Sequence, residues 1–407
     1  EEVYQDWDAT ALTLYHTDRP ATWDQQSHEL RLNYSGDRLS YTAGLYYWDS
    51  DYAIDLLSYI GFGDFLFGLP AGTVLEVPQS VTQTTKSSAI FVEGDYMMTD
   101  KWTLTLGGRY TKDKKTSGVV DPIMPELEEL GNPANPFKES WDEFTPKLAI
   151  SYQMNDALMF YGLYSKGFRA GGFNGRPGTY EAASIPYDPE TVDNFELGMK
   201  SEWLDRRLRF NVSIFHMDYK DKQEEQSVPT SQGTGQQTVV VNAAEATIRG
   251  LEIDFNYLVN DIFRIEGNLG LLDAEYDVLD DPITGTDLSY LKLRRAPEVT
   301  GSLIPVLTFE VGGGVLQARG AIRYVDDMEY TFLNSPQTQA RSHSTIDASL
   351  VYSINRFTVS LWGLNLNEDN TWTQGYDVGA QVGFDGLWSY TAIRPPRSYG
   401  INLRYDW

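Results

Sequence analysis

The sequence contains no cysteine and no long hydrophobic run among its 407 residues. Without cysteine there can be neither a disulfide framework nor thiolate ligands for a metal. A membrane-spanning helix needs about 18 or more consecutive apolar residues, and no such stretch exists, so helical membrane spans are excluded. The longest apolar segment, 54–77, is interrupted by aspartate, glycine and proline, and this composition predicts a loop.

Basic residues are scarce as well. Lysine and arginine number 32 against 58 aspartate and glutamate residues, which gives a formal net charge of -26. An acidic excess of this size argues against nucleic-acid binding, which requires a basic face. We interpret the excess as solvating charge spread over loops, rather than as a specific cation site.

Histidine is rare, and catalytic motifs are missing. The four histidines are too scattered to have the spacing of metal ligands, so neither a metal site nor a cofactor is predicted. Neither a Gly-x-Ser-x-Gly elbow nor a phosphate-binding Gly-Lys-Ser/Thr motif occurs. Adjacent acidic pairs fall in or next to predicted loops, where solvated charge explains them better than a glycosidase pair or a calcium site. The sequence therefore predicts a protein that is not an enzyme.

The chain does contain a regular series of hairpin signals. Short polar turns, flanked by runs of alternating polar and apolar residues, recur at 36–38, 100–101, 155–156, 205–206, 260–261, 312–313 and 355–356. Longer connectors separate these turns, at 51–83, 117–140, 171–189, 223–237, 280–295, 333–341 and 371–395. Short turns at one end of a structure and long loops at the other are typical of an outer-membrane β-barrel.

The predicted strands have one apolar face and one polar face. In one of them Leu251, Ile253 and Phe255 alternate with Glu252 and Asp254. Charges at alternate positions would disrupt the packed core of a soluble protein, whereas they suit a wet or plugged lumen. Aromatic residues near the strand ends match the girdles of membrane proteins. We predict an all-β fold, a transmembrane antiparallel up-and-down β-barrel with about 15 or 16 strands in this chain.

The alternation also predicts the direction of individual side chains. The residues expected to face the lumen are Arg109, Glu196, Arg249, Glu252, Asp254 and Arg404. Near Phe215, Met217 and Tyr219 the apolar set changes parity, which predicts a β-bulge at the membrane edge.

The last strand, 397–407, alternates up to the final residue of the chain. Its apolar face consists of Tyr399, Ile401, Leu403, Tyr405 and Trp407. Chain ends usually fray, whereas the terminal strand of a barrel is a seam that must stay ordered to its end. This strand therefore supports the prediction of a barrel.

Five segments carry a resemblance to a known family. Residues 164–174 (YSKGFRAGGFN) leave a strand for a loop instead of opening a helix, so a dinucleotide site is a weak interpretation of their glycines. Together with 190–200 (ETVDNFELGMK), 206–220 (RRLRFNVSIFHMDYK), 242–252 (NAAEATIRGLE) and 397–407 (RSYGINLRYDW), this segment resembles the barrel of TonB-dependent outer-membrane receptors. The resemblance runs through essentially the whole chain, in order.

The resemblance implies more than these residues contain. Such receptors have an N-terminal plug domain, with a segment that engages TonB, followed by a barrel of about 22 strands. Residues 1–407 would begin at about the seventh strand of that barrel, so we expect a partial barrel domain without a plug, the C-terminal part of a larger receptor. The implied location is the outer membrane of a Gram-negative bacterium.

The partners follow from the same resemblance. They are outer-membrane lipid, a small-molecule ligand such as an iron chelate, and the TonB-ExbB-ExbD energy-coupling complex, which would be reached through the missing plug region. In this family the assembly machinery of barrels recognises the terminal strand, which implies that role for the apolar face of 397–407. The alternative role of that face is simple packing in the aromatic girdle.

The function implied is energy-coupled uptake of a scarce, bulky nutrient such as a ferric siderophore. Aromatic rings and guanidinium groups suit planar, anionic ligands, although the same side chains could serve only to pack the loops together. The ligand contacts expected on these grounds come from two loops, with Phe168, Arg169, Phe173, Asn174 and Arg176 in one and Trp372, Tyr376, Phe384, Trp388 and Tyr390 in the other.

Two other functions stay open at this point. One is a passive, porin-like channel of about 16 strands, in which Arg109, Arg249, Arg323 and Arg404 would tune selectivity. The other is a soluble glycan-binding β protein, which the polar inner faces of the strands disfavour.

Overall fold

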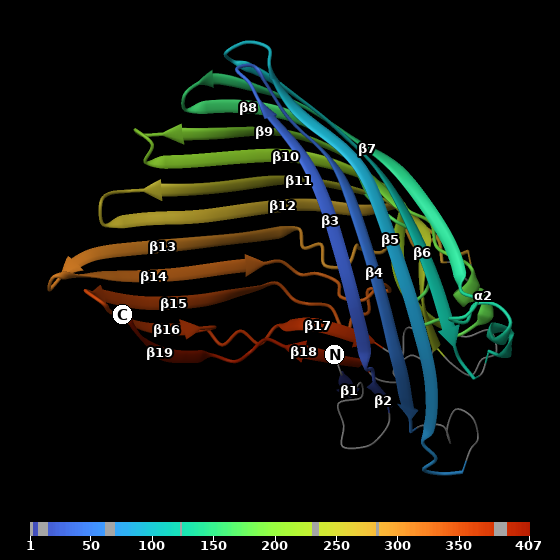
Figure 1. Ribbon diagram of the computed structural model, residues 1–407. Coiled ribbons are helices and arrows are strands. Elements are labelled where there is room, and N and C mark those ends of the chain that lie inside the picture. The colour runs from blue at the N-terminus through green and yellow to red at the C-terminus, as the bar shows by residue number, and fades with distance from the viewer. Residues whose placement is uncertain are drawn as a thin grey trace.

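The computed structural model describes residues 3–6, 15–61, 70–122, 124–229, 236–281, 285–377 and 389–407. A strongly curved antiparallel sheet dominates it (Figure 1). The strands are β1 (Tyr4–Asp6), β2 (Tyr15–Asp18), β3 (Ala21–Ser35), β4 (Leu39–Ile60), β5 (Leu75–Met97), β6 (Trp102–Val120), β7 (Phe137–Asn155), β8 (Leu158–Arg169), β9 (Glu190–Trp203), β10 (Leu208–Pro229), β11 (Gln236–Leu258), β12 (Phe263–Leu279), β13 (Val299–Val311), β14 (Gly314–Val325), β15 (His343–Ile354), β16 (Phe357–Leu364), β17 (Trp372–Asp377), β18 (Ser389–Ile393) and β19 (Ser398–Tyr405). Two short helices, η1 (Pro125–Glu128) and α2 (Tyr180–Ser184), lie in loops.

Successive strands pair in the order of the sequence. The pairing runs from β3 to β16, and β19 then pairs with β16. The short strand β2 pairs with the far end of β4, and β1 pairs with β2, while β17 and β18 form a separate hairpin. Residue-by-residue pairing joins β3 to β4 and β19 to β16, and the strand order of the sheet places β2 between β19 and β3.

The predicted short turns are confirmed, whereas several predicted loops are too long. Each of the seven polar turns joins two neighbouring strands of the sheet. In contrast, β4 continues to Ile60 and β5 begins at Leu75, so both ends of the segment 54–77 are paired strand and not loop. Paired strands satisfy each other's backbone groups with or without apolar alternation, which is why the sequence pattern underestimates their length.

The outer face of the sheet has the apolar belt that the alternation predicts. Leu30, Leu45, Ile90 and Tyr110 lie in register across four strands, and each is between 43% and 70% exposed. A continuous row of exposed apolar side chains suits lipid rather than water. On β6 the outward row is apolar from Trp102 to Tyr110, about the 9–11 residues that a membrane-spanning strand needs. Among the described residues, no helix has the length and apolar character to span a membrane.

The bulge predicted near Phe215 is in the wrong place. The pairing of β10 with β9 is regular through Tyr219, and the register with β11 shifts only between Tyr219 and Gln223, where Asp221 has a φ of 52°. Phe215 instead packs directly over Gly250. A Cβ on that glycine would lie only 2.3 Å from the Phe215 ring. The change of parity thus reflects an aromatic side chain that covers a glycine on the inner face.

Among the residues that the structure describes, the hydrophobic core lies at the long-loop end of the strands and consists of two clusters. The first cluster joins strand ends to the loops 121–136 and 170–189 through Val81, Val119, Met124, Leu127, Phe137, Phe173 and Ala183. The second joins the ends of β11 and β12 to the loops 280–298 and 326–342 through Ala244, Ala246, Tyr276, Leu279, Leu288, Leu291, Leu293 and Phe332. These clusters hold the long loops against the strands.

A substitution at Gly44 would test how closely the side chains of the inner face are packed. A Cβ there would lie 2.4 Å from the Phe91 ring and 2.8 Å from the backbone oxygen of Leu30, which cannot move without disturbing the ladder between β3 and β4. We expect Gly44→Val to destabilise the folded barrel by about 1–3 kcal/mol, as overpacking does. The measurement is the fraction of heat-modifiable, folded protein in the outer membrane. Gly175→Val is the control, since a Cβ at Gly175 meets nothing within 4 Å. Equal losses in the two variants would contradict the expectation.

Candidate functional site

The inner wall of the sheet carries most of the residues that were predicted to face the lumen. Arg109 lies over two aromatic rings, with its guanidinium carbon 5.2 Å from the centroid of Tyr46 and 5.7 Å from that of Phe91. Glu196 accepts a hydrogen bond from the hydroxyl of Tyr161 on the neighbouring strand. Both charged groups are therefore held in place by side chains of the same wall.

Further along this wall, Glu252 and Asp254 border an open hollow of about 450 Å³. Lys200, Asn211 and Asn268 also line it, and Asn211 Nδ2 donates a hydrogen bond of 3.2 Å to Asp254 Oδ1. Amides and charges of both signs make this part of the wall hydrophilic. Within the described ranges, no cluster of three or more histidine, aspartate or glutamate residues could hold a metal ion.

The two remaining arginines lie on different faces. Arg404 shares the polar face of β19 with Asp406, and their side chains form an ion pair of 2.7 Å. Arg249 lies on the face of Leu251 and donates from Nε to Nδ1 of His216 at 3.3 Å. The prediction that Arg249 faces the lumen is wrong, because the regular register of β11 puts it on the side opposite to Glu252.

Residues 170–189, here called the ledge, fold back against the inner face of the strand ends. Phe173 stacks on Phe137 with ring centroids 6.2 Å apart, and Gln79 Nε2 donates a hydrogen bond of 2.8 Å to the backbone oxygen of Pro177. The ledge contains α2, which lies beside the ends of β6 and β7 in Figure 1. Thr179 caps this helix by accepting a hydrogen bond from the amide of Ala182.

Two of the predicted ligand contacts are buried inside the ledge. Phe173 is 5% exposed, and Asn174 is 6% exposed. Asn174 Oδ1 accepts from the amide of Val240 at 2.7 Å, and its Nδ2 donates to the backbone oxygen of Ala182 at 2.9 Å. Both side chains therefore pack the loop and leave no surface for a ligand, which corrects the prediction for this pair.

The other three predicted contacts in this region remain accessible. Phe168 is half-buried near the end of β8, and Arg169 is exposed at its last position. Arg176 lies on the ledge, 3.7 Å from a carboxylate oxygen of Glu225. A surface pair of this length contributes little to stability, so the Arg176 guanidinium keeps much of its capacity to bind an anion.

A buried amide, Gln223, and a half-buried amide, Asn242, attach the ledge to β10 and β11. Gln223 Nε2 donates to the backbone oxygens of Ala170 and Asp188 at 3.1 and 3.0 Å. Asn242 Oδ1 accepts from the amide of Asp188 at 2.7 Å, while its Nδ2 donates to the backbone oxygen of the same residue at 2.8 Å. These bonds fix the ledge at Ala170 and at Asp188, near its two ends. The first hydrophobic cluster fixes the middle of the ledge.

A buried carboxylate, Glu224, connects β10 to the loop 280–298. Its side chain is 2% exposed and accepts hydrogen bonds from Tyr276 Oη at 2.7 Å and Arg294 Nη2 at 2.8 Å, with Lys222 as a third partner. Burial raises the pKa of Glu224, but Lys222, Tyr276 and Arg294 together outweigh burial and lower the pKa below its ordinary value. Burial and the neighbouring Glu224 charge raise the pKa of Tyr276, so this hydroxyl stays protonated as a donor.

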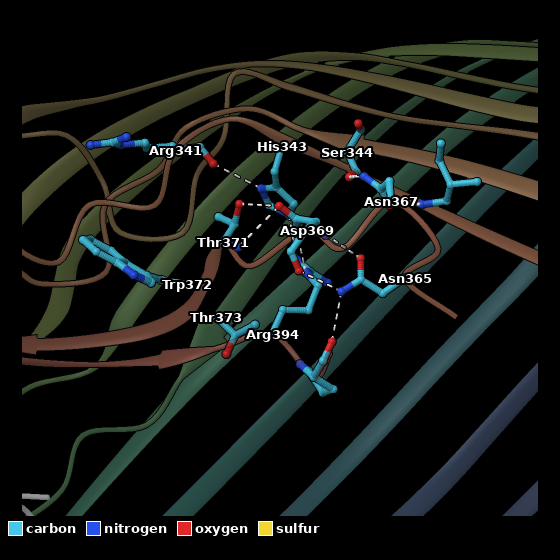
Figure 2. A network of polar contacts seen from close by, with 12 residues as sticks. Arg341, His343, Ser344, Asn365, Asn367, Asp369, Thr371, Trp372, Thr373 and Arg394 are labelled. Atoms are coloured by element: carbon cyan, nitrogen blue, oxygen red, sulfur yellow. Dashed lines mark hydrogen bonds and ion pairs between the residues drawn. The ribbon is translucent and has the colours of Figure 1, made fainter. Parts of the chain in front are cut away.

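A second polar network lies at the base of the hairpin formed by β17 and β18. Figure 2 shows Arg394 in one network with Asp369 and His343, with Nε donating to Asp369 Oδ2 at 3.0 Å and Nη2 donating to His343 Nε2 at 2.7 Å. Asn365 Nδ2 bonds the backbone oxygens of Asp369 and Pro395. Because a guanidinium only donates, His343 accepts at Nε2 and donates from Nδ1 to the backbone oxygen of Arg341 at 3.1 Å.

The hairpin carries the second group of predicted ligand contacts. Trp372 and Tyr376 are half-buried on β17, and Tyr390 is opposite Tyr376 on β18. Phe384 and Trp388 lie outside the described residues. The backbone oxygen of Trp372 accepts a hydrogen bond of 2.8 Å from Tyr330, so the hairpin is tied to the loop 326–342.

The apolar face of the terminal strand is exposed as its alternation predicts. The exposed fractions on this face are 79% for Tyr399, 59% for Ile401, 75% for Leu403, 42% for Tyr405 and 100% for Trp407. These side chains continue the apolar belt to the last strand.

Sequence reasoning missed the residues that fix the loops. Glu224 was interpreted as solvated charge in an acidic pair, and no role was predicted for Gln223, Asn242 or Arg394. The signal is absent from the local sequence, because Tyr276 and Arg294, the partners of Glu224, lie 52 and 70 residues further along the chain.

Comparison with known proteins identifies relatives of the chain. Residues 3–366 match the family model for the TonB-dependent receptor-like β-barrel. The metal-pseudopaline receptor CntO of Pseudomonas aeruginosa strain PAO1 is 25% identical over 320 residues, which cover 78% of this chain and 40% of that protein. The ferripyoverdine receptor of the same organism is 21% identical over 406 residues, which cover 98% of this chain and 44% of that protein.

Solved structures share the fold. The ferric yersiniabactin uptake receptor FyuA from Yersinia pestis has a TM-score of 0.77 at 19% identity, with 97% of this chain and 55% of that chain covered. The copper transporter OprC has a TM-score of 0.69 at 13% identity, with 98% and 58% covered. The chain thus spans about half the length of the curated relatives and solved structures that it matches.

Glu224 gives a prediction for the effect of pH. Its lowered pKa means that its contribution to loop docking is complete above the ordinary value of 4.5 and is lost as the pH falls through the folded-state pKa. We therefore expect proteolytic cleavage within 285–298 to accelerate below pH 4.5. We expect the Glu224→Gln variant to be cleaved faster at neutral pH, because the substitution leaves two cations without their shared carboxylate. Removing one partner of a buried ion pair costs about 3–5 kcal/mol of stability.

The neighbouring residue provides the control for this experiment. Glu225 is an exposed acid, so Glu225→Gln should leave the cleavage rate close to that of the unchanged protein. The role assigned to Glu224 would be refuted by equal rates in the two variants, or by cleavage that does not respond to acid.

Proposed function

The chain belongs to the TonB-dependent receptor-like β-barrel family, and from this we propose that it is the barrel part of an outer-membrane importer for a metal chelate such as a ferric siderophore. The observation that carries the proposal is the family match over residues 3–366. The outward apolar belt and the polar inner wall support it, because an importer in lipid needs both. Barrels of this family lie in the outer membrane of Gram-negative bacteria.

The choice of a metal chelate rests on the relatives. Their names describe receptors for metal-pseudopaline and ferripyoverdine, and the solved neighbours include an uptake receptor for ferric yersiniabactin. These ligands share a metal ion enclosed in an organic chelator. We propose the same class for this chain, bound between the ledge and the β17–β18 hairpin, where Arg169, Arg176, Trp372, Tyr376 and Tyr390 are the candidate contacts.

Energy coupling and assembly complete the proposal. We assign the contact with the TonB-ExbB-ExbD complex to a plug region that would belong to the same receptor but not to residues 1–407. We assign to the apolar face of β19 the recognition by the barrel assembly machinery, which the exposure of that face supports.

Uptake of radioactive iron by whole cells tests the proposal. Cells that express the complete gene product should take up at least one ferric chelate from a panel of citrate, catecholate, hydroxamate and mixed chelates. Deletion of the gene, deletion of TonB, or collapse of the proton gradient should each abolish that uptake.

A conductance measurement tests the alternative function, a passive channel. The purified complete gene product in a planar bilayer should remain closed to small ions, because energised importers keep the lumen blocked. Steady open channels, with iron uptake that does not depend on TonB, would overturn the proposal in favour of passive diffusion.

A further inference from the structure

Lys115 forms no ion pair within the described part of the chain, unlike two lysines of the following strands. It lies on the inner face of β6 beyond the apolar belt, and its Nζ is 5.9 Å from the ring centroid of Trp141. On the next two strands, Lys147 pairs with Glu93 at 2.9 Å and Lys166 pairs with Glu143 at 2.6 Å. Among the described residues, no ion pair or hydrogen bond reaches the ammonium group of Lys115.

A second cation without a partner lies close to the first. Arg169, at the end of β8, also forms no ion pair within the described part of the chain. Burial lowers the pKa of Lys115, the charge of Asp113 opposes this effect, and the charge of Arg169 lowers the pKa further. The two cations repel each other, and a bound anion would offset that repulsion.

The acids that could have neutralised this pair are engaged elsewhere. Glu139 is opposite Lys115 in the register of β6 and β7, but its Oε1 accepts the amide of Ser140 at 2.8 Å. Glu190 is opposite Arg169, but its Oε2 accepts the amide of Gln223 at 2.7 Å. Within the described part of the chain, both cations are therefore left without an ion pair, although carboxylates stand in register with both.

Aromatic side chains and glycine backbone border Lys115. A Cβ on Gly172 would lie 2.4 Å from Tyr187 Oη and 3.3 Å from Lys115 Nζ, and a Cβ on Gly171 would lie 2.6 Å from the Trp141 ring. Paired backbone hydrogen bonds of 3.1 and 2.8 Å between Gly172 and Tyr187 hold the ledge in this position. The glycines thus let the ledge approach Lys115, and the ledge closes one side of the space around that lysine.

We propose that Lys115 and Arg169, with Trp141 and Tyr187 as walls, form a subsite for an oxyanion of the transported chelate, of the carboxylate type. The assignment rests on the proposed function for the identity of the ligand, but the subsite itself rests on the two free cations. The guanidinium offers a fork for two oxygens, and the ammonium adds a point charge. The binding of an anion would offset both the burial of Lys115 and its repulsion from Arg169.

Chemical labelling of lysine with pyridoxal phosphate tests the subsite in outer membranes that contain the complete gene product. The amine of Lys115 condenses with the aldehyde and releases water, and borohydride then reduces the imine to a stable secondary amine by hydride transfer, with a proton taken from water. Because the phosphate of the probe would occupy the anion site, we expect Arg169→Gln to slow the labelling of Lys115 about tenfold and Arg169→Lys to slow it less.

Lys114 provides an internal control, since it is exposed on the other face of the same strand. Citrate in millimolar excess should protect Lys115 and leave the labelling of Lys114 unchanged. Peptide mass spectrometry measures both sites in one sample, and heat modifiability shows that each variant is folded. Equal protection of the two lysines, or a Lys115 rate that ignores Arg169→Gln, would overturn the subsite.

The labelling does not depend on transport, so the two proposals can fail separately. Citrate protection of Lys115 in a protein that imports no chelate would contradict the proposed function alone. Normal chelate uptake without citrate protection would contradict the subsite alone.

Discussion

The constraint on which the structure depends is that lipid offers no hydrogen-bond partners to a polypeptide backbone. Each strand must therefore satisfy its amides and carbonyls on neighbouring strands, and the chain does so by pairing each strand with the next from β3 to β16 and then with β19. The tight turns at one end follow from this ladder. At the other end the same pairing continues past the apolar belt, to Ile60 on β4 and to Pro229 on β10, and gives the long loops a rigid base.

The family match weakens one of the alternative functions. A passive channel of about 16 strands would be complete in itself. The chain instead belongs to the TonB-dependent receptor-like β-barrel family, and it spans less than half the length of the ferripyoverdine receptor that it matches.

At the long-loop end, polar groups have two different roles. Glu224 and Gln223 are buried and Asn242 is half-buried, and each bonds segments that are far apart in the sequence, which positions the ledge and the loop 280–298. Hydrogen bonds of this kind restrict the conformation of a loop. Lys115 and Arg169 lie nearby without such partners. Rigid loops around free cations are the arrangement expected where a receptor recognises an anionic ligand.

The sequence by itself determined the fold class, the seven short turns and the two faces of the strands, as the alternation of Leu251 and Glu252 illustrates. It misplaced Arg249 and the bulge near Phe215, and it gave no indication that Phe173 and Asn174 are enclosed or that Glu224 is buried. The physical reason is the distance along the chain between the residues that interact. A period of two is a local property of the backbone, whereas burial in a loop depends on partners as distant as the 70 residues that separate Glu224 from Arg294. Only the tertiary structure brings those partners together.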